Sequence, residues 1–192
     1  MLQPFSSSDK VANIIGIDPG SQTLGLSVLS FDVQSLQIVQ TQAQTFQGDR
    51  LPYFDEHIAK VHGERLARIY AHRQNLLNIL LHYRPVSVAC ESPFFNARRP
   101  NAFAALLEVM NEVRNAVMQY SPYMQLIAID PPTVKKAVGA PGNADKLGVL
   151  AALIKKQDEL RFTAISVPEL LDEHSVDATA VSYCRYKMLT ST

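Results

Sequence analysis

The 192-residue chain lacks several features that would assign it to a specialised class of protein. It has no apolar run approaching the roughly 18 residues of a membrane-spanning helix, so a helical membrane protein is not expected. Residues 1–10 are rich in serine and contain no apolar segment of the kind found in signal peptides. We therefore expect residues 1–10 to form a disordered tail. Residues 11–192 are expected to form one domain, located in the cytoplasm (the host cytoplasm if the source is viral).

The chain is also poor in cysteine and carries no net charge. Without a secretory signal, Cys90 and Cys184 are expected to be reduced and buried rather than joined in a disulfide. Lys and Arg together number 18, as do Asp and Glu, and this balance argues against a nucleic-acid-binding protein. Basic residues are nevertheless grouped in pairs, among them Arg98-Arg99 and Lys135-Lys136. This segregation of charge does not by itself identify a partner.

What the chain does contain is a pattern of strands followed by alternating helices and strands. Residues 14–29 predict a hairpin whose first strand, ending at Asp18, is buried because it has no polar face. The segments predicted after it are a strand over 36–46, a helix over 57–82, a strand over 86–91, a helix over 100–120, a strand over 124–129, a short helix over 131–138, a helix from an N-cap at Asn143 to about 157, and a last helix that begins near Glu173 or His174. This order predicts an α/β fold with a five-stranded mixed sheet, three antiparallel strands then two parallel ones, flanked by helices.

The helix predicted over residues 100–120 is apolar over more than one stripe. A helix that is apolar over so wide an arc is usually covered on both sides. It is therefore expected either in the centre of the domain or at a subunit interface.

Two of the predicted buried strands end in a carboxylate, Asp18 and Glu91. If these strands are parallel neighbours, both acids emerge at the same end of the sheet, where they repel each other unless a cation lies between them. Mg²⁺ takes oxygen ligands and keeps positions open for phosphates. His174 and Asp177, spaced i and i+3, would share one face of the last helix and complete a two-metal site suited to phosphodiester hydrolysis.

Each of these residues also has a simpler interpretation. Asp18 could be a turn residue, and Glu91 could be a surface acid. His174 could be a helix cap or an exposed helix residue. Asp177 could interact only with the helix dipole. Asp172 and Glu173 are either rival ligands or part of a solvated acidic turn. The pair Arg98-Arg99 would ordinarily lie in a solvated loop.

Several short motifs occur in a fixed order along the chain. They are Ile-Ile-Gly-Ile-Asp-Pro-Gly-Ser ending at Ser21 with Thr-Leu-Gly beginning at Thr23, Cys-Glu-Ser-Pro-Phe ending at Phe94, Pro-Thr-Val-Lys-Lys ending at Lys136, Gly139 followed by Ala-Asp-Lys ending at Lys146, and His-Ser-Val-Asp-Ala-Thr-Ala ending at Ala180. In this order they resemble the RuvC family of Holliday-junction resolvases, over residues 13–188. The first motif alone also resembles other members of the RNase H-like superfamily, including ATP-binding ones. The resemblance implies an RNase H-like fold, a homodimer, and symmetric nicking of two strands at a four-way DNA junction.

The resemblance also implies roles for individual residues. By matching motifs, Asp18, Glu91 and Asp177 are metal-binding acids, and His174 occupies a position where many members have aspartate and some have histidine. The implied cofactor is two Mg²⁺ ions per site, or Mn²⁺, which imidazole ligation would favour. Lys146 is a candidate to stabilise charge on the phosphorus. The residues expected to contact DNA are Phe94, which matches a base-stacking aromatic, together with Arg98, Arg99, Lys135, Lys136 and Lys146.

Dimerisation is expected through the helix over 100–120. Two other hypotheses remain open. One is a nuclease of the same fold that acts more broadly on branched DNA or on RNA-containing hybrids. The other is a catalytically inactive junction-binding protein in which His174 marks a lost metal site.

Overall fold

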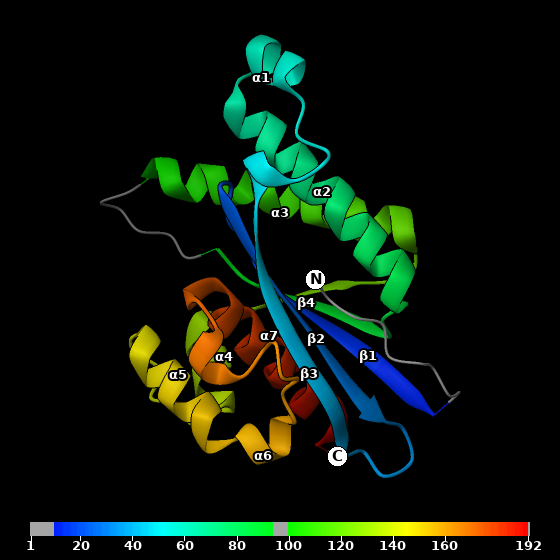
Figure 1. Ribbon diagram of the computed structural model, residues 1–192, viewed down its shortest axis with the longest axis vertical. Coiled ribbons are helices and arrows are strands. Elements are labelled where there is room, and N and C mark those ends of the chain that lie inside the picture. The colour runs from blue at the N-terminus through cyan, green and yellow to red at the C-terminus, as the bar shows by residue number, and fades with distance from the viewer. Residues whose placement is uncertain (1–9, 94–99, 192) are drawn as a thin grey trace.

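The structure, a computed structural model, describes residues 10–93 and 100–191 (Figure 1). Residues 1–9, which make up most of the predicted tail, lie outside the described residues. The same is true of three residues predicted to contact DNA: Phe94, Arg98 and Arg99.

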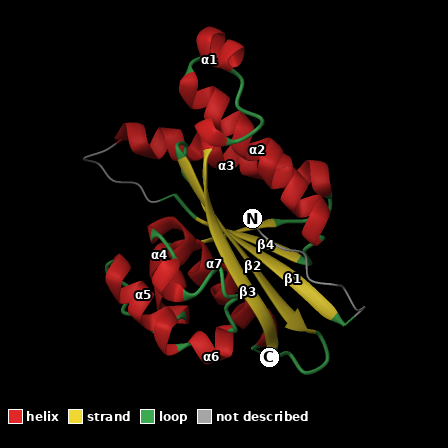
Figure 2. Cartoon of the chain, viewed as in Figure 1, coloured by secondary structure: helices red, strands yellow, loops and turns green. Residues whose placement is uncertain are grey.

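Five strands form one mixed sheet in the order β3-β2-β1-β4-β5. Figure 2 shows the strands between helices on either side. The strands are β1 (Val11–Asp18), β2 (Thr23–Asp32), β3 (Ile38–Gln47), β4 (Ser87–Glu91) and β5 (Leu126–Ile129). The first three pair antiparallel, while β4 pairs parallel with both β1 and β5. The predicted succession of three antiparallel and two parallel strands is therefore confirmed. Because Ile17 lies opposite Cys90, the next residues along β1 and β4, Asp18 and Glu91, lie at the same end of the sheet.

Helices cover both faces of the sheet (Figure 1). On one face lie α2 (Glu64–Tyr83) and α3 (Pro100–Tyr120); on the other lie α4 (Pro131–Ala137), α5 (Lys146–Lys155) and α7 (Glu173–Thr190). Shorter elements are η1 (Gly48–Arg50), α1 (Glu56–His62), α6 (Gln157–Leu160) and η2 (Pro168–Leu170). Strand β1 lies between these two layers and is buried on both sides over residues 14–17, which explains why Ile14, Ile15 and Ile17 leave no polar face.

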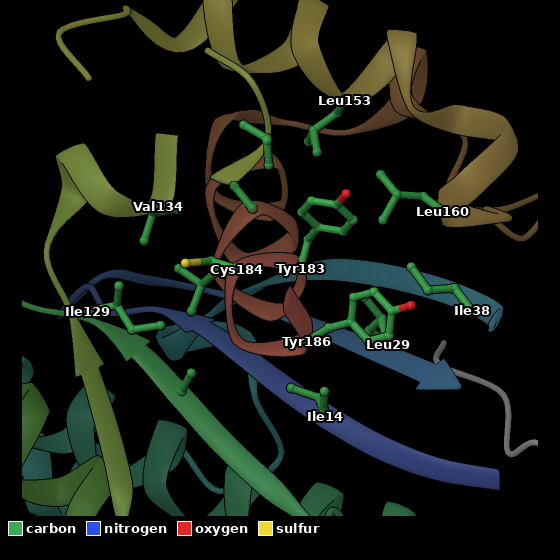
Figure 3. Packing of buried hydrophobic residues seen from close by; sticks show 14 of the residues in the cluster. Ile14, Leu29, Ile38, Ile129, Val134, Leu153, Leu160, Tyr183, Cys184 and Tyr186 are labelled. Atoms are coloured by element: carbon green, nitrogen blue, oxygen red, sulfur yellow. The ribbon is translucent and has the colours of Figure 1, made fainter. Parts of the chain in front are cut away.

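Helix α7 is the central helix of its layer. Its residues Tyr183, Cys184 and Tyr186 lie between the sheet and the outer helices, as Figure 3 shows. The helix also approaches β1 very closely at Gly16. A Cβ added to this glycine would lie only 2.4 Å from the main-chain oxygen of Ala178. This contact sets the position of the α7 N-terminus relative to the strand ends.

Two predicted helix boundaries are wrong. The helix predicted over 57–82 is divided into α1 and α2 at Gly63, whose φ of 92° interrupts the helical backbone. The N-cap of α5 is Asp145 and not Asn143, because the Asp145 side chain accepts a hydrogen bond from the Gly148 amide at 2.9 Å. Asn143 instead lies in a turn in which the Ala144 amide donates to the Pro141 carbonyl.

Helix α3 spans the predicted residues 100–120. Val113, Ala116 and Val117 are buried against the sheet and α2, whereas Leu107 and Met118 are exposed. The helix is thus a core element that also presents apolar side chains at the surface.

Cys90 and Cys184 are both free and buried, as expected. Within the described ranges, no helix is long and apolar enough to cross a membrane.

Candidate metal centre

Three carboxylates meet at one end of the sheet. Asp18 ends β1, Glu91 ends β4 and Asp177 lies in the first turns of α7; one oxygen of each lies within 4.8 Å of the others. All three side chains are partly buried. They converge because β1 and β4 are parallel neighbours and because α7 packs directly on β1 at Gly16. The predicted convergence of these acids is therefore what the structure shows.

The acids strongly perturb one another. Burial, followed by the charges of Asp18 and Asp177, raises the pKa of Glu91 to about 8. Burial and the charge of Asp18 raise the pKa of Asp177 to about 6. A divalent cation would relieve this repulsion, and carboxylate oxygens are the donors that Mg²⁺ and Mn²⁺ prefer. The donor chemistry and spacing of this cluster therefore fit a hard divalent metal.

His174 lies beside the three acids but is not one of the group. Its Nδ1 is 2.7 Å from Asp18 Oδ2, and its Nε2 is 2.8 Å from Thr23 Oγ1. The hydrogen bond to Asp18 raises the pKa of His174, against the opposing effect of burial. The imidazole would have to exchange one of these contacts to ligate a metal, so its role as a ligand stays a prediction.

The two acids that precede His174 have other partners. Asp172 is the N-cap of α7: its Oδ1 accepts hydrogen bonds from the Ser175 amide at 2.9 Å and from Thr45 Oγ1 at 2.5 Å. Glu173 pairs through Oε2 with Lys146 Nζ at 2.7 Å. Neither acid belongs to the three-carboxylate group.

Two predicted basic residues lie near the acids. Lys146, the first residue of α5, and Lys135 on α4 both lower the pKa of Glu91, although less than burial and the other acids raise it. The Lys135 ammonium donates to the Ala144 carbonyl at 2.7 Å and so fixes the loop that leads into α5. Lys136, in the last turn of α4, is exposed.

A groove of about 800 Å³ between β3 and α2 lies apart from the acid cluster. Asp172 lines it, but Asp18, Glu91 and Asp177 do not. The candidate metal centre is therefore at the strand ends and not in this groove.

Sequence reasoning did not single out the roles of Thr23 and Thr45. Thr23 contacts His174, and Thr45 contacts the α7 cap, Asp172. Both contacts join residues more than 120 positions apart along the chain. Thr23 belongs to the opening motif, but the motif does not indicate its contact with His174, and no local pattern marks Thr45.

Solved structures share this fold. Thermus thermophilus RuvC superimposes with a TM-score of 0.66 at 23% identity, covering 94% of this chain and 97% of that one. The yeast mitochondrial Holliday junction resolvase Ydc2 gives a TM-score of 0.57 at 11% identity, covering 92% of this chain and 81% of that one. The chain therefore has the fold of these two proteins, and the predicted fold class is confirmed.

Sequence comparison makes the assignment narrower. The family model described as crossover junction endodeoxyribonuclease RuvC matches residues 14–185. The RuvC of Geotalea uraniireducens (strain Rf4) is 30% identical over 181 residues, covering 89% of this chain and 86% of the relative. The RuvC of Myxococcus xanthus (strain DK1622) is 30% identical over 173 residues, covering 89% and 78%. The chain belongs to the RuvC family.

Proposed function

We propose that this protein is a divalent-metal-dependent endonuclease that resolves four-way DNA junctions by paired, symmetric nicks. The observation that carries the proposal is the convergence of Asp18, Glu91 and Asp177 at one end of the sheet, in a chain of the RuvC family. The curated relatives are named crossover junction endodeoxyribonucleases. Thermus thermophilus RuvC has been solved in complex with a Holliday junction substrate, which supports the same substrate class here.

The three acids, joined by His174, would hold two Mg²⁺ or Mn²⁺ ions. Such a pair supplies an activated water and stabilises the leaving oxygen of a phosphodiester. The chain's own contribution is to hold the carboxylates close together and partly buried, so that they favour a divalent cation. Lys146 adds a positive charge at the margin of the cluster, where charge develops on the phosphoryl oxygens.

Symmetric cleavage requires two sites on one junction, and a homodimer would provide them. We propose that α3 forms the dimer contact, because Leu107 and Met118 present apolar surface on a helix that is otherwise part of the core. Contacts to DNA are proposed for the basic and aromatic residues Phe94, Arg98, Arg99, Lys135, Lys136 and Lys146. We place the activity in the cytoplasm, where the thiols of Cys90 and Cys184 would stay reduced.

Asp18→Asn tests the metal centre. The substitution removes a carboxylate charge with little change in shape, so cleavage of a labelled immobile four-way junction should be lost while binding in a gel-shift assay is retained. Asp158→Asn, at an exposed position on α6, is the matched control and should cleave normally. Cleavage by Asp18→Asn at the wild-type rate would show that the metal site is wrongly assigned.

The substrate is tested by comparing a four-way junction with flaps, three-way junctions and RNA–DNA hybrids under the same conditions. We expect cleavage of the four-way junction with Mg²⁺ or Mn²⁺ and none with EDTA. Equal cleavage of all substrates would favour the broader nuclease. Binding without cleavage in either metal would favour an inactive junction-binding protein.

A further inference from the structure

Two helix N-termini meet at the margin of the metal centre and bring an ion pair there. Lys146 is the first residue of α5, and Glu173 is the first residue of α7. Lys146 Nζ lies 2.7 Å from Glu173 Oε2, and Glu173 Oε1 lies 3.5 Å from His174 Nε2. The Glu173 carboxylate therefore lies between the lysine and the histidine.

The backbone on both sides of this ion pair is anchored. Lys135 donates to the Ala144 carbonyl, and Asp145 caps α5. Asp172 caps α7. Exposed ion pairs are often weak because two long, mobile side chains must be ordered together. The Lys146–Glu173 pair is exposed too, but capping and tertiary contacts hold the Cα atoms of both partners in place. Forming the pair therefore orders the two side chains without also ordering the backbone that carries them.

Glu173 also competes with the acids for the lysine. Asp177 and Asp18 both attract Lys146, and an ammonium with no other partner would move toward them and occupy the space required by a metal. Glu173 lies outside the three-carboxylate group. Its carboxylate holds the Lys146 ammonium beside the cluster and leaves the oxygens of Asp18, Glu91 and Asp177 available.

We propose that Glu173 is a positioning residue for Lys146: it holds the ammonium at the margin of the metal centre, where Lys146 can contact the scissile phosphate. An ammonium has three N–H donors, so Lys146 can bind a phosphate oxygen without leaving Glu173. The inference rests on the proposed function of the site. It extends that function to a residue outside the predicted catalytic set.

This role predicts a separation between catalysis and binding. Glu173→Ala should lower the single-turnover cleavage rate about tenfold, because small misplacement of a catalytic group is costly. Junction affinity should be unchanged or higher, because the substitution removes a negative charge near incoming phosphates. Glu173→Gln should recover most of the rate, because its amide oxygen can still accept a hydrogen bond from Lys146.

A double-mutant cycle provides the decisive comparison. Glu173→Ala should slow cleavage in the wild-type background and have no further effect in Lys146→Ala. Glu64→Ala is the matched control: Glu64 is the first residue of α2 and pairs with Arg68 at 3.2 Å, and its loss should leave the rate unchanged. An equal loss of rate from Glu173→Ala in both backgrounds, or a loss explained entirely by weaker junction binding, would overturn the proposal.

An assay without DNA separates this inference from the proposed function. The rate at which acetic anhydride labels Lys146 is measured by mass spectrometry, with the exposed Lys155 as internal reference. Labelling should be several-fold faster in Glu173→Ala than in the wild type, because the ammonium loses its partner. Unchanged labelling refutes the ion pair even if junctions are cleaved. Faster labelling in a protein that cleaves no branched DNA refutes the proposed function instead.

Discussion

Replacing Glu91 by glutamine is expected to stabilise the metal-free protein, although it removes a predicted metal ligand. Glu91 is partly buried and faces Asp18 and Asp177, and these surroundings raise its pKa from 4.5 to about 8. A carboxylate whose pKa is raised by folding weakens the fold as pH rises from the unfolded to the folded pKa, because the folded chain holds a proton that the unfolded chain has lost. Glutamine has a similar shape and no titratable proton, so it does not contribute this loss of stability.

The magnitude follows from the interval between the two pKa values. At pH 7 the unfolded chain has ionised Glu91 while the folded chain has not, and each pH unit of this interval is worth about 1.4 kcal/mol. Between pH 4 and pH 7, the stability of Glu91→Gln relative to the wild type should therefore increase by about 3 kcal/mol. For a chain of this size that corresponds to a relative increase of about 6–12 °C in Tm.

The assay is urea or thermal unfolding in EDTA at several pH values from 4 to 9. The exposed Glu169→Gln is the control and should follow the wild type at every pH. Saturating Mg²⁺ should then stabilise the wild type far more than Glu91→Gln, because binding to the folded state is lost with the carboxylate. If the difference in free energy of unfolding between the wild type and Glu91→Gln did not change with pH, the electrostatic account of the cluster would be refuted.

Three further substitutions test the surroundings of the site. Gly25→Ala places a Cβ 2.2 Å from the main-chain oxygen of His174, so it should displace the start of α7 and lower the free energy of unfolding by about 1–3 kcal/mol. It should also weaken Mg²⁺ binding measured by calorimetry, and an unchanged Mg²⁺ affinity would contradict this close contact. Burial lowers the pKa of His72 from 6.5 to about 4, so the protein loses stability as pH falls through this range. In urea titrations at several pH values, His72→Leu should not show this loss. If its free energy of unfolding depended on pH as that of the wild type does, this explanation would be wrong. Thr45→Val removes the hydrogen bond to Asp172 and should lower the free energy of unfolding by about 1 kcal/mol. An unchanged free energy of unfolding would mean that this hydrogen bond does not stabilise the cap.

The sheet and the ends of its strands follow from local sequence. Only four residues, 19–22, connect β1 to β2, and so short a link forces an antiparallel hairpin. The later strands are joined through helices, which permit parallel pairing. Once β1 and β4 are parallel neighbours, carboxylates that end both strands must emerge together. Asp18 and Glu91 were predictable for this reason.

Helix boundaries depended on details that periodicity does not resolve. The apolar pattern continues across Gly63, and only the backbone angle there shows that α1 and α2 are separate. Asn143 and Asp145 are both suitable caps by residue type. Asp145 became the cap because residues 141–144 form a turn and Lys135 holds the Ala144 carbonyl.

The sequence by itself therefore determined the fold class, the family and the acids that end the strands, because these depend on local hydrophobic patterns and short motifs. The partners of the site's remaining residues were decided only by tertiary structure. His174 contacts Asp18 and Thr23, and Glu173 contacts Lys146, because α7 crosses β1 at Gly16 and because α5 begins beside the start of α7. Such contacts join segments that no periodicity relates, and they exist only once the helices have packed on the sheet.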